Sequence, residues 1–226
     1  MTSGTKLRRP AISEILLIVL SVFLAVAAEG WWDEQGRAAD ARAVLAQSLE
    51  ELLADRSDLE EVRALQESRG TQYQDLQRWL SDYRTMPLDS VGAALDSIAW
   101  SNRTLWPRRA GWTTMVSGNQ LSLLQAPELV ASLASHHENL NARIRANGDN
   151  YGRAVNRLVL EATPKIWDAQ NRVLLSDDPD EIATFRTEVY LVYYSWNQWY
   201  TEYLREYSTA LDALIAVVQS FLDDET

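Results

Sequence analysis

Two adjacent histidines are the first residues in this chain whose type suggests chemistry. His136 and His137 precede Glu138, and all three are metal-ligating residue types. Neighbours on a helix point in different directions, so the pair cannot easily share one ion, and we expect no metal site here. With no other histidine and no cysteine in the chain, a Ser-His-Asp triad, a thiolate metal site and a cysteine nucleophile are not expected either.

A second candidate is a run of carboxylates. Its members are Asp177, Asp178, Asp180 and Glu181. The spacing lacks the glycine and distal glutamate of a calcium loop, and with Pro179 it is typical of a helix start. No P-loop, zinc-protease, nucleophile-elbow or dinucleotide motif is present. We therefore expect no enzyme activity, no cofactor and no metal, although a deep cleft with paired carboxylates would revive a membrane-anchored hydrolase.

Aromatic residues are concentrated near the C-terminus. Five of them step by three and four residues along one helical stripe: Tyr193, Trp196, Tyr200, Tyr203 and Tyr207. We interpret this stripe as a core seam, and a surface for a partner, lipid or flat cofactor is the alternative. Three more lie off the stripe and predict a partner-binding surface: Tyr190, Tyr194 and Trp199.

One basic aromatic cluster lies mid-chain. It contains Trp106, Arg108, Arg109 and Trp112. Tryptophan anchors interfaces and arginine pairs with carboxylate or phosphate, so the cluster predicts a site for an anionic partner or lipid headgroup. The alternative is an ordered loop whose tryptophans pack inward.

The N-terminal segment predicts a membrane anchor. Residues 12–28 are almost entirely apolar, at the short end of what spans a bilayer, and Trp31 and Trp32 follow as interfacial anchors. Arg8 and Arg9 precede the stretch, which places the N-terminus in the cytoplasm by the positive-inside rule. The expected division is a cytoplasmic segment 1–11, a transmembrane helix 12–30 and an extracytoplasmic domain 31–226. A cleavable signal peptide is the alternative.

The net charge and the hydrophobic periodicity of the chain indicate its partners and its fold class. The chain carries 32 acidic against 21 basic residues, a net charge of -11, which argues against a nucleic-acid partner. Helical periodicity dominates and strand signals are nearly absent. We expect an all-α fold in which one N-terminal transmembrane helix precedes an elongated antiparallel helical bundle. The acidic run within residues 50–61 is interpreted as a solvated face.

The expected helices follow from Pro, Gly and capping residues. The first runs on from the membrane, breaks at Arg69-Gly70 and stops before Pro87. The last helix begins within residues 176–181 and ends at Leu222. Between them we expect helices at 91–100, 113–124, 128–145 and 151–162, with a loop at 102–112 and a short helix from Pro164 that ends before Ser176.

Two segments resemble a known kind of protein. Residues 14–32, an apolar run followed by Trp31-Trp32, and residues 115–133, with Ser117-Gly118 and Glu128-Leu129, are similar to uncharacterised bacterial single-pass membrane proteins. The resemblance implies one N-terminal anchor and a helical extracytoplasmic domain. It carries over no catalytic residues, because those families are domains of unknown function.

Together these features predict an interaction protein of the bacterial inner membrane with its main domain in the periplasm. We expect an accessory or stabilising subunit of a larger respiratory or photosynthetic complex, whose partners are the bilayer and other integral membrane subunits. The alternative is a membrane-tethered sensor or small-ligand-binding protein that acts through a partner.

Overall fold

A single helix organises the molecule. The computed structural model describes residues 11–82, 84, 87, 89–90, 92–93, 95 and 103–224, without the side chains of 11–15 and 194–195. Helix α1 runs unbroken over Ala11–Ser81, 71 residues, which is about 105 Å at 1.5 Å per residue. The predicted break at Gly70 is therefore wrong. One glycine inside a helix costs only about 1 kcal/mol, which tertiary packing of the flanking turns offsets.

The C-terminal part of α1 packs against the other helices through a regular seam of buried residues. Its buried residues alternate at spacings of three and four, as in a coiled coil. The seam positions are Ala41, Leu45, Ser48, Leu52, Asp55, Leu59, Val62, Gln66, Arg69, Tyr73, Leu76 and Leu80, and Trp79 is buried beside the last of them. Four of these positions are polar, and because their side chains are buried they need hydrogen-bond partners inside the protein.

Shorter elements follow α1. The first group is α3 (Ala110–Ser117), the 3₁₀ turn η1 (Leu121–Leu124), α4 (Pro127–Ala134), the π segment η2 (Ser135–Leu140) and α5 (Asn141–Arg157). The second is the π segment η3 (Leu158–Ala162), α6 (Thr163–Ile166), and the strands β1 (Trp167–Asp168) and β2 (Val173–Leu174). The third is α7 (Pro179–Tyr190), the π segment η4 (Leu191–Asn197) and α8 (Gln198–Asp223).

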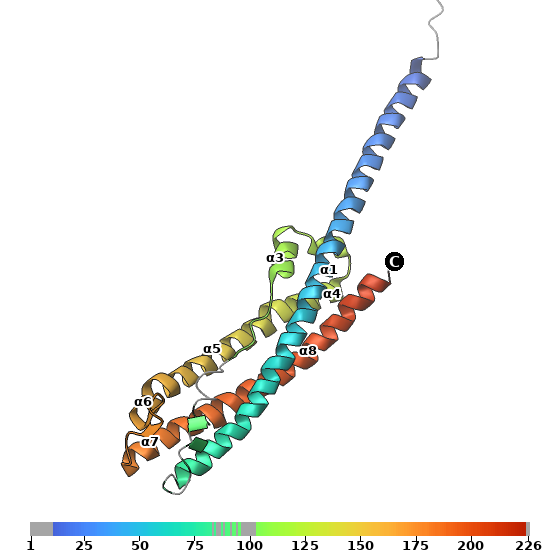
Figure 1. Cartoon of the computed structure of the whole chain (residues 1–226). Helices are drawn as coiled ribbons and strands as arrows, with labels where there is room; N and C mark the ends of the chain where they lie inside the picture. The colour runs from blue at the N-terminus through green and yellow to red at the C-terminus, as the bar shows by residue number, and fades with distance from the viewer. Residues whose placement is uncertain are drawn as a thin grey trace, which may run out of the picture.

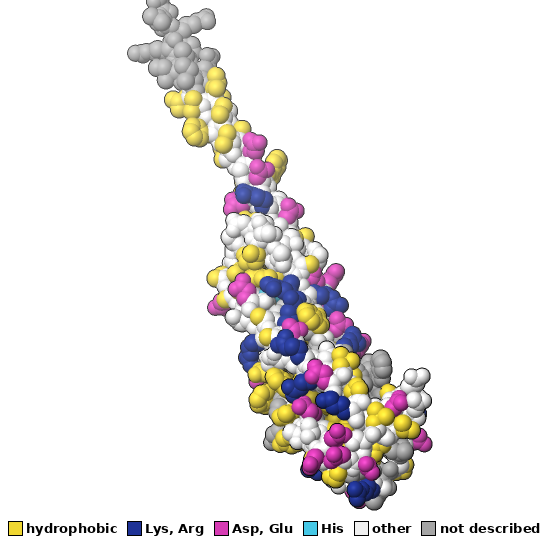
Figure 2. All heavy atoms as spheres, turned by 90° about the vertical axis from the view of Figure 1, so that its left-hand side faces the viewer, with side chains coloured by type: hydrophobic (Ala, Val, Ile, Leu, Met, Phe, Trp, Pro, Cys, Tyr) yellow, Lys and Arg dark blue, Asp and Glu magenta, His cyan; other side chains and the backbone are white. Residues whose placement is uncertain are grey.

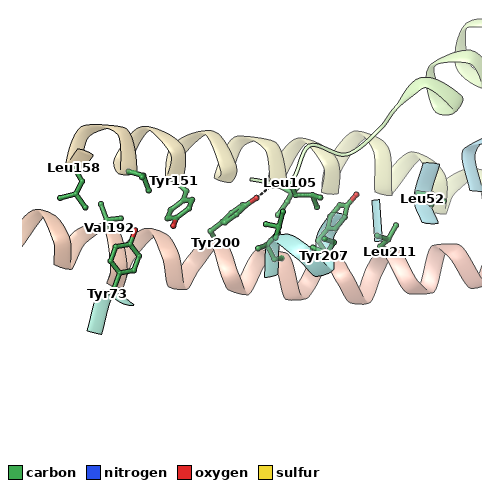
Figure 3. Close-up of a cluster of buried hydrophobic side chains, with 14 of the residues drawn as sticks. Leu52, Tyr73, Leu105, Tyr151, Leu158, Val192, Tyr200, Tyr207 and Leu211 are labelled. Carbon is green, nitrogen blue, oxygen red and sulfur yellow. Dashed lines mark hydrogen bonds between the residues drawn. The ribbon is translucent and has the colours of Figure 1, made fainter. Parts of the chain in front are cut away.

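Three long helical segments lie side by side in the described body: α1, α4–α5, and α7–α8 (Figure 1). Gln74 of α1 contacts Tyr193, whereas Arg63, earlier in α1, contacts Ser208, so α1 and α8 are antiparallel. Tyr151 of α5 stacks on Tyr200 of α8 with ring centroids 5.4 Å apart. Apolar side chains of the three segments pack together in the core (Figure 3).

The mainly helical prediction is confirmed, with local corrections. The short helix expected after Pro164 ends at Ile166, and residues 167–174 form a two-stranded antiparallel pair instead. Trp167 adopts an extended backbone, and Arg172 has a φ of 53° that turns the hairpin. The helix predicted at 113–124 is interrupted after Ser117. The one predicted at 91–100 falls largely outside the described residues.

Other boundaries follow the sequence signals. Asp178 caps α7 by accepting a hydrogen bond from the Asp180 backbone N–H at 2.9 Å, which supports capping for that acidic run. The gap predicted between the helices at 128–145 and 151–162 is wrong, because α5 runs through Asn147–Asn150 without a break.

The N-terminal part of α1 projects from the body. Residues 16–37 are exposed, and Ala41 is the first buried position. Figure 2 shows hydrophobic side chains on the outer part of the projecting helix, and charged side chains of both signs from there onward and over the body. By length and composition alone, α1 could cross a membrane.

The π segments correct the aromatic stripe. Buried positions in α7 and η4 are Ile182, Phe185, Val189 and Val192, and the next buried position among the described side chains is Asn197, five residues on. The inserted residue shifts the core face to Asn197, Tyr200, Leu204 and Tyr207. Of the predicted stripe, Tyr200 and Tyr207 are therefore core residues, whereas Tyr193, Trp196 and Tyr203 are half-buried at its edge.

Candidate functional site

The acidic face of α1 holds the loop that precedes α3. Asp55 accepts two hydrogen bonds from the Arg108 backbone N–H, at 3.2 and 2.9 Å, and one from its guanidinium at 2.7 Å. Asp58 accepts a fourth from the same guanidinium at 2.9 Å. The side chain of Asp55 is 1% exposed, so this is a charged contact at the core boundary.

We call the contacts of Asp55 and Asp58 with Arg108 the clamp, and contacts on either side extend it. Arg103 pairs with Glu61 and Asp58, and Glu51 accepts from the Gly111 backbone N–H at 3.1 Å. A Cβ at Gly111 would lie 3.0 Å from the Ser48 backbone, which explains a glycine at this close approach. The acidic run predicted to be a solvated face is thus corrected: four of its carboxylates hold the chain's own loop.

Opposing effects set the charge state of the clamp. Burial raises the pKa of Asp55 above its usual value, and the hydrogen bonds from Arg108 partly offset that rise. The Asp55 hydrogen bond in turn raises the pKa of Arg108. Arg108 is therefore committed to α1 and has little capacity left for an anionic ligand.

A buried polar layer surrounds the two histidines. The Tyr207 hydroxyl donates to Asn141 Oδ1 at 2.8 Å and lies 3.1 Å from His136 Nε2. Because its hydrogen goes to Asn141, the hydroxyl accepts from His136, whose Nε2 carries the proton. Asn141 Nδ2 lies 3.2 Å from His137 Nδ1, and the His137 ring stacks on Trp112 at 5.2 Å.

The π segment η2 explains why consecutive histidines are both buried, since the inserted residue turns two neighbours toward the core. Desolvation lowers the pKa of His136 to about 4. It lowers the pKa of His137 to about 3, and repulsion of the protonated ring by His136 and Arg109 adds to that decrease. Among the described residues, no group of three or more His, Cys, Asp or Glu side chains could hold a metal ion.

A second buried polar layer lies further along the bundle. The Arg69 guanidinium donates to the Tyr151 hydroxyl at 2.9 Å. The Leu105 backbone N–H donates to the Tyr200 hydroxyl at 2.7 Å (Figure 3). Burial raises the pKa of both tyrosines, so they remain neutral donors and acceptors. This layer ties α1, the loop at 103–109, α5 and α8 together.

The four residues of the predicted basic aromatic cluster do not lie together on the surface. Trp112 is 4% exposed, so the surface position expected for it is wrong, because it packs on His137 within the core. Trp106 remains 59% exposed, with the Arg145 guanidinium 5.8 Å from its ring. Arg109 is exposed. Of the four residues, Trp106 and Arg109 keep an accessible side chain suited to a partner.

The remaining predicted positions lie elsewhere. Trp199 is 61% exposed and packs edge-on against Trp196 at 6.2 Å; Tyr190 is 44% exposed. Trp31 and Trp32 are exposed on the projecting helix. Arg8, Arg9 and the side chain of Tyr194 lie outside the described residues.

Three surface hollows each border a π segment. One of about 360 Å³ lies between α5–α6 and α7, with Phe185 and Ile166 among charged side chains that include Lys165. A second, of about 430 Å³ between α4–η2 and α8, is lined by alanine, serine, leucine and valine side chains and by His136. The third, of about 380 Å³ between α1 and η4–α8, is lined mainly by polar side chains.

The polar residues of the α1 seam were not predicted from the sequence. Ser48, Asp55, Gln66 and Arg69 fall on the three-and-four spacing of the apolar stripe, and that coincidence was the available signal. Asn141 and the histidines had no such signal, because η2 disrupts the helical period there.

Comparison with known proteins gives one finding. A model described as a family of unknown function (DUF6090) matches residues 14–196. No curated protein and no solved structure matches the chain.

Proposed function

We propose that this chain, which belongs to the DUF6090 family of unknown function, is a membrane-anchored interaction protein without enzyme activity. The observation that carries the proposal is the projecting part of α1. Its apolar residues 16–28 make no contact with the body, and water is a poor environment for so large an apolar surface. A bilayer would bury it.

The proposed topology follows from the flanking residues. The basic N-terminus stays in the cytoplasm of a bacterium, residues 12–30 span the inner membrane, and Trp31 and Trp32 lie at its outer interface. The body then lies in the periplasm, held at a fixed distance by the unbroken helix.

The proposed role is that of an accessory or stabilising subunit of a larger membrane complex, of respiratory or photosynthetic type. Three exposed side chains support a partner-facing body: Trp106, Arg109 and Trp199. Tryptophan and arginine are the residues that most often dominate binding energy at protein interfaces. Within the membrane, the apolar face of α1 would pack against other spanning helices.

Purification of the full chain in mild detergent, followed by identification of co-purifying subunits, tests this role. We expect integral membrane proteins to be retained by the native chain and lost from a Trp106→Ala/Trp199→Ala variant. Leu175→Ala, which removes an exposed apolar side chain at the hairpin, is the matched control and should keep them. A chain that remains monomeric with no partner contradicts the proposal.

A second candidate is a tethered ligand-binding protein that acts through a partner. The pocket between α5–α6 and α7 favours it, because the apolar side chains of Phe185 and Ile166 lie among groups of both charges. Native mass spectrometry of the purified chain separates the two candidates. A retained small molecule supports the second, and retained subunits support the first.

A further inference from the structure

The pocket between α5–α6 and α7 has an apolar floor inside a charged rim. Phe185 and Ile166 line it although each is only 2% exposed, so they form its floor. The π segment η3 supplies Glu161 and Ala162 to one wall, and π segments inside helices often mark functional sites. The volume of about 360 Å³ is enough for a small organic molecule. Both α6 and α7 lie at the end of the body far from the projecting part of α1, so the pocket lies away from the proposed membrane segment (Figure 1).

The charged side chains of the rim are of two kinds. Arg157 and Glu188 bind each other at 2.6 Å, so their charges are already compensated. The side chains of four other lining residues form no hydrogen bond or ion pair with any described residue: Glu161, Lys165, Asp180 and Glu181. Lys165 belongs to α6, whereas Asp180 and Glu181 belong to the first turn of α7. Opposite charges therefore border one apolar floor without neutralising each other.

Lys165 differs from the other cations of the body. It is the only lysine among the described residues, and the other permanently cationic side chains there are arginines. Arginine binds carboxylates through its planar guanidinium, as Arg108 does with Asp55 and Asp58. The compact lysine ammonium instead stays separate from the carboxylates of the pocket and offers a point charge. Among the residues that line the pocket, one cation and three carboxylates are therefore open to a ligand.

The lining indicates the chemistry of the ligand. A ligand carboxylate can bind the Lys165 ammonium, and a ligand ammonium can bind the carboxylates of Asp180 and Glu181. An apolar side chain placed between these two groups would cover the floor and leave water. We propose that this pocket binds a zwitterion with an apolar side chain, an α-amino acid or a dipeptide. The proposal rests on the second candidate function, the tethered ligand-binding protein, and names its ligand.

Calorimetric titration of the full chain at pH 7, in a non-ionic detergent and at low ionic strength, tests the proposal. The probes are L-phenylalanine, L-leucine and the dipeptide Leu-Phe. Each is compared with two analogues, one that lacks the ammonium group and one that lacks the carboxylate. We expect saturable binding of at least one probe, and at least tenfold weaker binding of both its analogues, because each analogue leaves one side of the pocket without a partner.

This measurement needs no partner subunit, so it separates the ligand from the role in a complex. Failure of the probes to bind would leave the anchoring and the interaction role standing. Conversely, a purified chain that retains no small molecule can still bind a probe that is added to it, which would contradict only the idea that the ligand stays bound during purification.

Two substitutions separate binding from folding. Lys165→Met removes the ammonium but keeps an unbranched side chain, and should weaken the bound probe at least tenfold. Its thermal midpoint should not change, because Lys165 is exposed and has no partner among the described residues. Arg186→Met is the matched control, since it removes an exposed cation of α7 that does not line the pocket, and it should leave the affinity unchanged. Failure of all three probes to bind, an analogue that binds as tightly as its probe, or equal affinity in Lys165→Met would overturn the proposal.

Discussion

At the scale of single residues, the body depends on polar groups buried in helical seams. Asp55, Gln66 and Arg69 occupy positions on α1 that leucine would fill in a simple coiled coil. Each finds a partner on another element, in the loop at 103–109 or on α5. Polar seam residues of this kind fix register and partner choice, so they specify how the helices pair.

The buried histidines predict sensitivity to acid. In the native protein desolvation lowers the pKa of His136 to about 4 and that of His137 to about 3, whereas both titrate near 6.5 when unfolded. The unfolded state therefore binds more protons as the pH falls below 6.5. Stability should decrease from there toward pH 4, by up to about 1.4 kcal/mol per pH unit for each histidine.

Denaturant unfolding at pH 7, 6, 5 and 4.5 measures this dependence. Carboxylates also titrate in this range, so the comparison is between the native chain and a His136→Gln/His137→Gln variant. The variant should show the shallower decrease. Parallel pH profiles would mean that the histidines are accessible to protons in the native state.

At the scale of elements, the clamp on α1 determines where the loop at 103–109 lies. Without Arg108, Asp55 keeps its backbone hydrogen bonds but loses its nearest cation, and burial then acts on the carboxylate with less compensation. The clamp also brings α3 and Trp112 over the histidine layer.

Arg108→Ala should therefore destabilise the protein by about 2 kcal/mol. Arg109→Ala, one residue further on at an exposed position, should change stability by less than about 0.5 kcal/mol. Equilibrium urea unfolding of the two variants measures the difference. Equal stabilities would show that Asp55 and Asp58 are satisfied equally well without the guanidinium.

The π segment η4 permits another prediction at this scale. Removing one residue from it joins the seam ending at Val192 to the seam starting at Asn197 in ordinary helical spacing. Deletion of Ser195 should therefore give a folded protein with a cooperative transition. Deletion of Thr201 within α8 should not, because it turns the whole seam from Leu204 onward out of the core. Circular dichroism melts of both deletions distinguish the cases.

At the scale of the whole molecule, α1 has two separate parts. Residues 41–80 contribute one side of the core, and residues 16–37 are exposed and add nothing to it. The unbroken helix joins the proposed membrane segment directly to the seam. A rotation or tilt of the helix in the membrane would therefore be transmitted to the body.

A shortened chain that starts at Asp33 tests this division. It should stay in the supernatant after ultracentrifugation and melt at the same temperature as the full chain in detergent, because no core residue is removed. The full chain should sediment with membranes and resist extraction at high salt. A large loss of thermal stability in the shortened chain would mean that the projecting part packs against the body.

Much of the architecture is contained in local signals of the sequence. The apolar N-terminal stretch, the seam of α1 and the Asp178–Pro179 helix start depend on neighbouring residues and on periods within one helix, so each can be recognised without a partner. Trp106 and Trp199 are exposed, and a partner-binding surface at these residues stays a prediction.

The sequence by itself determined that this chain is mainly helical and has one exposed apolar segment, because residue type and spacing decide those properties. Only the tertiary structure decided which polar groups meet. Asp55 and Arg108 are far apart in the chain, and a π insertion rotates every residue after it, so small local changes redirect whole helical faces. The burial of Trp112, the histidine layer and the hollow between α1 and η4–α8 all arise from that long-range packing, which cannot be recognised from a local sequence pattern.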